Sequence, residues 1–446
     1  MQMSLKKMFL KYVSFNILSM VGLSCYIFAD TLFIAAGAGS RGLAALNLAL
    51  PVFSFMNGIG LMLGMGAATK YSILRAEGKT ERADQYFVQA MITAAVLGVL
   101  LTVAGLCFSG QITRILGADQ EVGALTKSYL STLLSFSAAF LLNNVLICFV
   151  RNDGKPNLSM AAMLAGSFSN IILDYLFIFP MGLGMTGAAL ATGLAPVISM
   201  AVLSLHKLRG NNGFHLKPIK WEWHCLGKTA GVGAASFINE FSAGVVMLLF
   251  NFVILRLAGN TGVAAYGVVA NLSLIVMAVF TGIAQGIQPI VSTSFGKKEF
   301  VGLLRVGGAA LLLAVCLGIV FYLTGLLFPK QIVGMFNGAG DAQLQAIAEK
   351  GVHLYFIAFL MMGVNITASA FFAAVARQRQ STAISVLRGF GAVLPFLAVL
   401  SFCMGMTGVF LTVPFAEGVT AALSLKYLHT YKKQSAGHLP PAGNIQ

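Results

Sequence analysis

Hydrophobic residues fall into twelve long runs that short polar segments separate. Each run has roughly the 20 residues that an α-helix needs to cross a bilayer, whereas the strands of a membrane barrel need only about 9–11. The pattern therefore predicts an all-α polytopic membrane protein with twelve transmembrane helices. The runs cover residues 13–36, 42–69, 86–108, 124–150, 158–180, 184–205, 229–255, 263–295, 303–328, 351–376, 381–403 and 405–428.

Composition supports this fold class and excludes a soluble globule. The chain is 58% hydrophobic and only 10% charged, whereas about a quarter of the residues in a soluble domain are charged. The net charge of +15 does not indicate nucleic-acid binding, because no soluble domain is expected that could present a basic face. Lys and Arg instead collect in the cytoplasmic loops of membrane proteins.

The distribution of charge along the chain predicts its orientation. With the N-terminus in the cytoplasm, 23 of the 29 Lys and Arg residues fall on the cytoplasmic side, and six helices in each half return the chain to that side. Both termini are therefore expected to be cytoplasmic. The first run continues past Asp30 without a small-residue cleavage site, so we expect it to remain a membrane span.

The chain repeats itself at a nearly constant offset. The sequence GMTG begins at Gly184 and again at Gly405, 221 positions later, and GSRGLAA at 39–45 corresponds to GNTGVAA at 259–265. Such a repeat predicts two six-helix bundles of the same orientation, with a cleft between them that opens alternately to either side. We expect an N-lobe at 1–205, a basic cytoplasmic linker at 206–228, a C-lobe at 229–428 and a cytoplasmic tail at 429–446.

Four acidic residues lie inside the apolar runs, namely Asp30, Asp174, Glu240 and Glu417. A charge at the centre of a bilayer costs on the order of 2.5–3.5 kcal/mol, so such residues normally mark a pathway or a binding site. No Lys or Arg is expected near mid-span in the first half to neutralise Asp30 or Asp174. Unpaired buried acids either carry a proton or bind a cation.

Several residues in the same half of the chain could supply hard oxygen ligands beside these acids. Asn170 and Asp174 are four residues apart and share one helix face, and Asn144 and Thr192 supply further oxygens. We therefore expect a coupling site for H⁺ or Na⁺ at Asp30, Asn144, Asn170, Asp174 and Thr192, with Na⁺ held by Asp30, Asn170, Asp174 and Thr192. The alternative is that Asp174 is protonated and only bonds a neighbouring helix. The repeat argues against this alternative, because Pro395 occupies the equivalent position in the second half.

Three polar residues of the second half are candidates for lining a substrate path. Glu240 has no acidic counterpart in the first half and could meet a cationic substrate or a proton, or bond within the C-lobe. Gln285 and Gln288 interrupt the eighth run beside Pro289, as in a bent helix bordering water. Glu417 follows Pro414 and is expected to satisfy the backbone that this proline frees.

The twelve-span layout, the acid in the first run and the Asn-x-x-x-Asp pattern of the fifth resemble the multidrug and toxic compound extrusion (MATE) family. The resemblance covers about residues 13–428 and includes Pro51 and the stretch from Gln285 to Pro289. The residues that match the cation site of prokaryotic members are Asp30, Tyr129, Asn144, Asn170, Asp174 and Thr192. An acid that some members carry in the tenth run is absent from 351–376, which argues against a separate C-lobe cation site.

This resemblance implies a secondary active antiporter, not an enzyme, in the plasma (inner) membrane of a prokaryote. It would export bulky, often cationic amphipathic compounds in exchange for Na⁺ or H⁺, without an organic cofactor. Its partners would be the lipid bilayer and drug-like small molecules, and it would function as a monomer. Tyr129, Glu240, Gln285 and Gln288 are the candidate substrate-lining residues.

The alternative function is a lipid-linked precursor flippase of the same superfamily. Such a flippase would carry several arginines in its cavity to bind pyrophosphate, and no mid-span arginine is expected here. A membrane enzyme would need a His/Asp/Glu cluster or a Ser/Lys pair, and a channel would need a continuous ring of polar residues. The sequence shows neither pattern.

Overall fold

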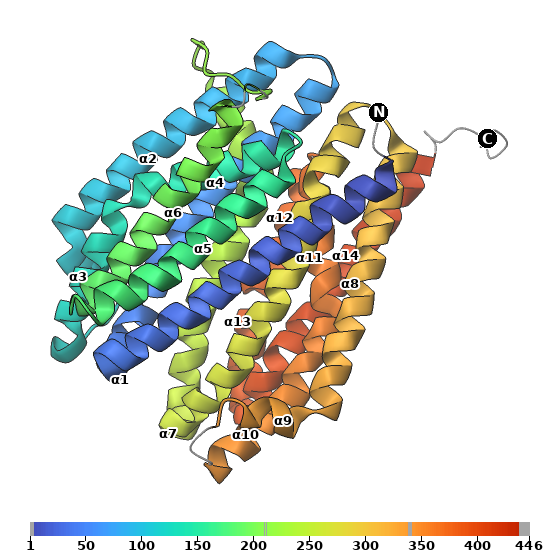
Figure 1. Ribbon diagram of the computed structural model, residues 1–446. Coiled ribbons are helices and arrows are strands. Elements are labelled where there is room, and N and C mark those ends of the chain that lie inside the picture. The colour runs from blue at the N-terminus through green and yellow to red at the C-terminus, as the bar shows by residue number, and fades with distance from the viewer. Residues whose placement is uncertain (1–3, 209, 211, 338–340, 437–446) are drawn as a thin grey trace. The chain divides into compact units, whose positions relative to one another are not determined.

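The computed structural model describes residues 4–208, 210, 212–337 and 341–436, and within these ranges all regular structure is helical (Figure 1). This confirms the all-α class. Arg209 of the predicted linker and residues 437–446 of the predicted tail lie outside the described ranges. The helices are α1 (Leu5–Ala76), α2 (Thr80–Ile115), α3 (Gln120–Ser135), α4 (Ser137–Asn152), α5 (Pro156–Ile178), α6 (Gly184–Leu208), α7 (Trp223–Gly296), α8 (Phe300–Leu327), α9 (Pro329–Gly334), α10 (Ala342–Tyr355), the short 3₁₀ turn η1 (Phe356–Ala358), α11 (Phe359–Ala374), α12 (Gln378–Val386), the π-helical turn η2 (Leu387–Gly391), α13 (Val393–Met404) and α14 (Met406–Ala436).

The membrane spans agree with the hydrophobic runs. In the described part of the chain, 11 helical segments are long and apolar enough to cross a membrane, and α3 and α4, which are bent by 50° relative to each other, meet the same criteria when taken together. Counting this pair as one span gives the predicted twelve. The bend falls at Phe136, whose backbone leaves the helical region between the two helices.

The internal repeat is visible in the backbone. α1 and α7 each consist of two helical legs joined at a glycine with positive φ, 65° at Gly39 and 58° at Gly259. A second equivalent pair, Gly184 and Gly405, has φ of 51° and 56°. Only glycine adopts this region without strain, so the repeated GSRG/GNTG and GMTG sequences place the same turns in both halves.

The same repeat holds for helix capping. Asp119 accepts hydrogen bonds from the first backbone N–H groups of α3, and Asp341 does the same for α10. An aspartate at the N-cap satisfies donors that the helix itself leaves without a partner. Both halves therefore start an equivalent helix with the same device.

The chain forms two compact units. Unit 1 contains residues 1–17, 75–78 and 249–446, and unit 2 contains residues 18–74 and 79–248. Within unit 2, α5 packs on α6 and α2 packs on α3 and α4, and within unit 1, α8 packs on α11 and α13 on α14. The chain passes from one unit to the other inside α1 and inside α7, so the compact units do not have the boundaries of the predicted lobes. The lobes as moving bodies remain a prediction.

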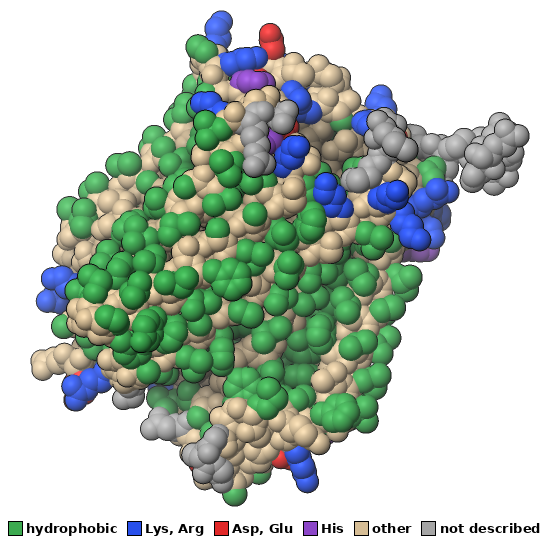
Figure 2. Space-filling model, viewed as in Figure 1, with side chains coloured by type: hydrophobic (Ala, Val, Ile, Leu, Met, Phe, Trp, Pro, Cys, Tyr) green, Lys and Arg blue, Asp and Glu red, His purple; other side chains and the backbone are tan. Residues whose placement is uncertain are grey.

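The exposed side of α5 is apolar. Phe168 and Ile172 of α5 are 61% and 60% exposed, and Figure 2 shows hydrophobic side chains along the flanks of the helices, with Lys and Arg gathered near their ends. A surface of this kind matches a bilayer, whose hydrocarbon core contacts the flanks while its headgroups meet the helix ends.

Candidate functional site

Two carboxyl groups meet inside unit 2. Asp30 comes from the first leg of α1 and Asp174 from α5, and their side chains share a hydrogen bond. Asp30 is only 7% exposed and Asp174 is fully buried. The predicted pairing of these acids in one site is therefore what the structure shows, although their role in coupling stays a prediction.

An amide and two hydroxyl groups complete this carboxyl pair. With its amide oriented to satisfy both neighbours, Asn170 donates to Asp174 Oδ2 at 2.9 Å and accepts from the Thr192 backbone N–H at 3.1 Å. Thr192 Oγ1 donates to the carbonyl oxygen of Ala188 at 3.0 Å, and the Tyr129 hydroxyl is hydrogen-bonded to the Thr192 side chain. Helices α1, α3, α5 and α6 thus contribute one group or more to a single buried cluster.

The cluster can bind a proton or a small cation. A hydrogen bond between two carboxyl groups requires a proton on one of them, because two adjacent carboxylates would repel each other in a buried site. Asp30 and Asp174 form no ion pair with any described residue, and one oxygen of each carboxyl (Oδ1) has no hydrogen-bond partner among these residues. These free oxygens and the Asn170 and Thr192 side chains are the hard ligands that Na⁺ prefers.

Asn144 has a different neighbourhood from the one we expected. Its amide donates to Asn57 Oδ1 at 2.8 Å, and the Asn57 amide in turn donates to Glu240 Oε2 at 3.1 Å. The contacts of Asn144 therefore connect it to Glu240 and not to the Asp30–Asp174 pair. Glu240, which comes from the second half of the sequence repeat, lies in unit 2 with these two residues.

Three phenylalanines come from the same helices as Asn57 and Glu240, namely Phe55 from α1 and Phe237 and Phe241 from α7. The rings of Phe237 and Phe241 stack at 5.6 Å with an angle of 17° between them, and Phe55 packs edge-on against both at 5.8 Å. Glu240 lies between Phe237 and Phe241 in sequence on the same leg of α7. A half-buried carboxylate beside aromatic faces is a suitable environment for an organic cation.

The two glutamines belong to the other compact unit. Gln285 and Gln288 belong to the second leg of α7, in unit 1, where Gln288 is fully buried. Tyr129, also expected to line the substrate path, is only 4% exposed and contacts the carboxyl cluster. Their roles in substrate binding remain predictions.

Unit 1 contains a polar cluster that the sequence did not reveal. Arg388, counted from the sequence among the 23 cations on the cytoplasmic side, lies in the π-helical turn η2 within the span Gln378–Met404, and its Nε donates to Glu417 Oε1 at 2.7 Å. Asn365 donates to Glu417 Oε2 at 2.7 Å and accepts from Ser424 Oγ at 2.8 Å. The expectation of no mid-span arginine did not allow for Arg388, and Glu417 forms an ion pair in addition to any contact with the backbone.

Comparisons with known proteins agree with this architecture. The MatE family model matches residues 16–176 and 235–399. The multidrug export protein MepA of Staphylococcus aureus (strain NCTC 8325 / PS 47) is 27% identical over 406 residues, covering 89% of this chain and 88% of that protein. MepA of Staphylococcus saprophyticus is 28% identical over 409 residues, with 89% and 88% of the two chains covered.

Solved structures share the fold. An outward-facing multidrug resistance MATE family transporter of the MOP superfamily matches with a TM-score of 0.90 at 22% identity, covering 97% of both chains. A mutant of the Vibrio cholerae MATE transporter VcmN matches with a TM-score of 0.88 at 18% identity, covering 96% of this chain and 97% of that one. The family model spans more than half of the chain, and members of this family are transporters and not enzymes, as the sequence predicted. The chain belongs to the multidrug and toxic compound extrusion (MATE) family of multi-pass membrane transporters.

Proposed function

We propose that this protein is a secondary active multidrug efflux antiporter of a prokaryotic plasma membrane. It exports bulky amphipathic compounds, many of them cationic, in exchange for inward H⁺ or Na⁺. Family membership and the multidrug export proteins among its relatives support the transport class. The buried Asp30–Asp174 pair supports the coupling, because such a pair changes its charge whenever it exchanges an ion.

The coupling step uses the hydrogen bond between the two carboxyl groups. Loss of the shared proton leaves two negative charges side by side, and their repulsion separates the α1 and α5 side chains unless a cation enters between them. If the ion is Na⁺, Asp30, Asp174, Asn170 and Thr192 would hold it. The ion shifts the transporter between its states only if it binds one of them more tightly.

The substrate would meet a second carboxylate in the same unit. Glu240 offers a negative charge, and the neighbouring Phe55, Phe237 and Phe241 offer aromatic faces that bind cations and planar apolar groups. Asn57 and Asn144 orient the carboxylate through their hydrogen bonds. Recognition by charge and aromatic surface without a fixed polar pattern is suited to chemically diverse substrates.

The flippase alternative gains no support from Arg388. A pyrophosphate cavity needs free positive charge, whereas the Arg388 guanidinium is already paired with Glu417. The antiporter therefore remains the better supported function.

Asp174→Asn tests this proposal. The substitution keeps the size of the side chain and removes its charge, so cells that express the variant should accumulate a fluorescent cationic dye that wild-type cells extrude. Asp119→Asn is the matched control, because Asn also caps a helix well and extrusion should stay near the wild-type level. Both variants are compared at equal amounts in the membrane. Full extrusion by Asp174→Asn would refute the role of the carboxyl pair.

A further inference from the structure

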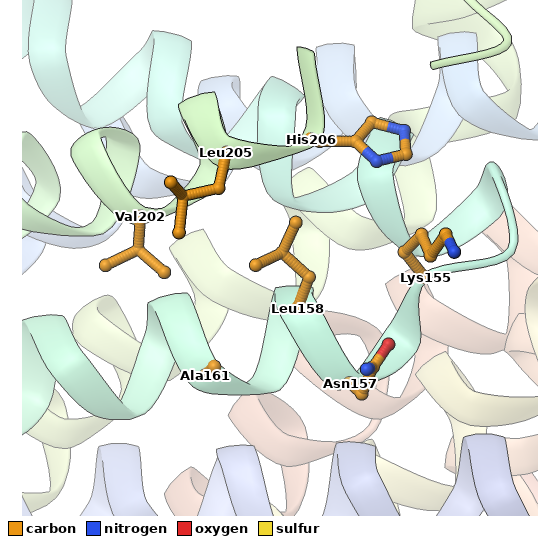
Figure 3. A pocket seen from close by; sticks show the side chains of 7 residues that line it. All are labelled: Lys155, Asn157, Leu158, Ala161, Val202, Leu205 and His206. Carbon is orange, nitrogen blue, oxygen red and sulfur yellow. The ribbon is translucent and has the colours of Figure 1, made fainter. Parts of the chain in front are cut away.

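A groove of ≈ 410 Å³ lies between the first turns of α5 and the last turns of α6, outside the two sites described above. Its walls are Leu158 and Ala161 of α5 and Val202 and Leu205 of α6. Figure 3 shows these apolar side chains facing one another across the space between the two helices. The groove therefore offers an apolar channel along the side of unit 2.

One end of the groove is polar. Lys155, Asn157 and His206 line it there, and Figure 3 shows all three at the same end, away from Val202 and Ala161. Lys155 is exposed and forms no ion pair with a described residue, and no side chain caps the first turn of α5 that follows it. His206 is 2% exposed and its Nε2 bonds Asp153 Oδ2 at 2.8 Å, while its Nδ1 has no partner among the described residues. The polar end thus presents a cation and polar groups available to a ligand.

The groove lies on a surface suited to lipid. Leu205, on the α6 wall of the groove, is 38% exposed. The other wall belongs to α5, and this helix continues into the apolar face that includes Phe168 and Ile172. Its polar end is the end from which the basic linker departs, which the charge distribution predicts to be cytoplasmic. A ligand here would have its head at the level of the headgroups and its tail along the hydrocarbon.

We propose that this groove is a binding site for an anionic phospholipid of the cytoplasmic leaflet. The phosphate would lie at Lys155 and the first turn of α5, and an acyl chain would follow Leu158, Ala161, Val202 and Leu205. Basic pockets between transmembrane helices on this side of a membrane suit anionic headgroups. A zwitterionic lipid would bring its own ammonium group close to Lys155, and a soluble phosphate would leave the apolar channel unused.

The bound lipid would also stabilise the linker. Asp153, the partner of His206, accepts a hydrogen bond from the Tyr71 hydroxyl at 2.6 Å and another from the backbone N–H of Gly213 in the linker. A headgroup that packs against His206 would stabilise the position of this ring, and with it the hydrogen bond from His206 to Asp153. Occupancy of the groove should therefore slow proteolysis of the linker. This inference does not depend on which ion or drug the protein transports.

The test measures lipid binding to the purified, delipidated full-length protein by native mass spectrometry. Phosphatidylglycerol and phosphatidylcholine with identical acyl chains are compared, and glycerol phosphate serves as the headgroup without chains. About 1 kcal/mol for one lysine near the surface corresponds to a preference for phosphatidylglycerol of about fivefold. Lys155→Glu should abolish the preference, and Lys207→Glu, an exposed cation one position beyond His206, should retain it.

A second variant tests the apolar channel separately. Ala161→Trp fills the groove and leaves Lys155 in place, so it should weaken binding of phosphatidylglycerol without changing the weak binding of glycerol phosphate. Melting temperatures without lipid establish that each variant is folded. Equal affinity for the two lipids, equal effects of Lys155→Glu and Lys207→Glu, or equal binding of glycerol phosphate and phosphatidylglycerol would each overturn the proposal.

Discussion

The ion pair between Arg388 and Glu417 permits a quantitative prediction. The Arg388 side chain is 13% exposed and that of Glu417 3% exposed, with 2.7 Å between Nε and Oε1. Removing one partner of such a pair leaves the other charge buried without a counter-charge, which costs about 3–5 kcal/mol. Removing both charges together removes the desolvation penalty as well, so replacing the pair with two apolar residues should change the stability of the protein little.

We therefore expect a strongly non-additive double-mutant cycle. Arg388→Met and Glu417→Met should each lower the melting temperature by about 6–20 °C, taking about 2–4 °C per kcal/mol for a domain of this size. The Arg388→Met/Glu417→Met double variant should recover most of that loss. Arg305→Met, which removes an exposed cation from α8 in the same unit, should change the melting temperature little.

The assay is thermal unfolding of each purified variant in the same detergent. Unfolding is measured as the loss of the monodisperse fraction with rising temperature. A double variant that loses as much as the two single variants combined would refute the reasoning. In that case the two residues act independently, and the ion pair does not determine their contribution to stability.

Three further predictions concern unit 2. A Cβ at Gly66 would lie 2.0 Å from a backbone carbonyl oxygen of the facing helix, whereas a Cβ at Gly227 would have no atom within 4 Å. Gly66→Ala should therefore lower the melting temperature by at least the equivalent of about 1–3 kcal/mol, and Gly227→Ala should leave it unchanged. Equal melting temperatures of the two variants would contradict this close packing. Asp153→Ala removes the acceptor of three hydrogen bonds and should lower the stability of the folded protein by about 2–4 kcal/mol. Proteolysis of the linker should become faster, and an unchanged cleavage rate would show that Asp153 does not anchor the linker. Asn57→Ala removes the hydrogen bond to Glu240. At unchanged expression, it should raise the KM for a cationic dye about tenfold, the equivalent of about 1.4 kcal/mol. An unchanged KM would show that this amide has no role in substrate binding.

The sequence predicted the fold well because its signals are local and strong. A run of about 20 apolar residues has few alternatives to a membrane helix, and the positive φ at Gly39 and Gly259 follows from sequence motifs that the two halves share. An aspartate within such a run is equally conspicuous. Asp30 and Asp174 could therefore be assigned to a site before any contact between them was known.

What the sequence missed depends on contacts between distant residues. Asn144 and Asn170 are both amides in apolar runs, and only the packing of the helices shows that Asn144 bonds Asn57, 87 residues away, while Asn170 bonds Asp174. Arg388 lies inside the run predicted at 381–403, and nothing in the local sequence shows that its partner is Glu417, 29 positions further along the chain. Pairing of opposite charges makes an arginine tolerable at a depth where it would otherwise be expensive.

The division of the chain into units was also not accessible from the repeat. The repeat divides the sequence between the sixth and seventh helices, whereas residues 1–17 belong to unit 1 and residues 223–248 to unit 2. Close contacts between glycines and facing backbone, such as Gly233 against the carbonyl oxygen of Met62, hold the first leg of α7 in unit 2. A hydropathy pattern shows which helices exist but not which of them meet.

The central claim is that the Asp30–Asp174 pair couples transport to an ion gradient. Its most direct test is efflux of a fluorescent cationic dye in proteoliposomes under an imposed Na⁺ gradient or an imposed pH gradient, for wild type, Asp30→Asn and Asp174→Asn. The account predicts that one of the gradients drives efflux by the wild type and that both variants lose this driven component while still binding the dye. Gradient-driven efflux that is the same in wild type and variants, or wild-type efflux that responds to neither gradient, would contradict it.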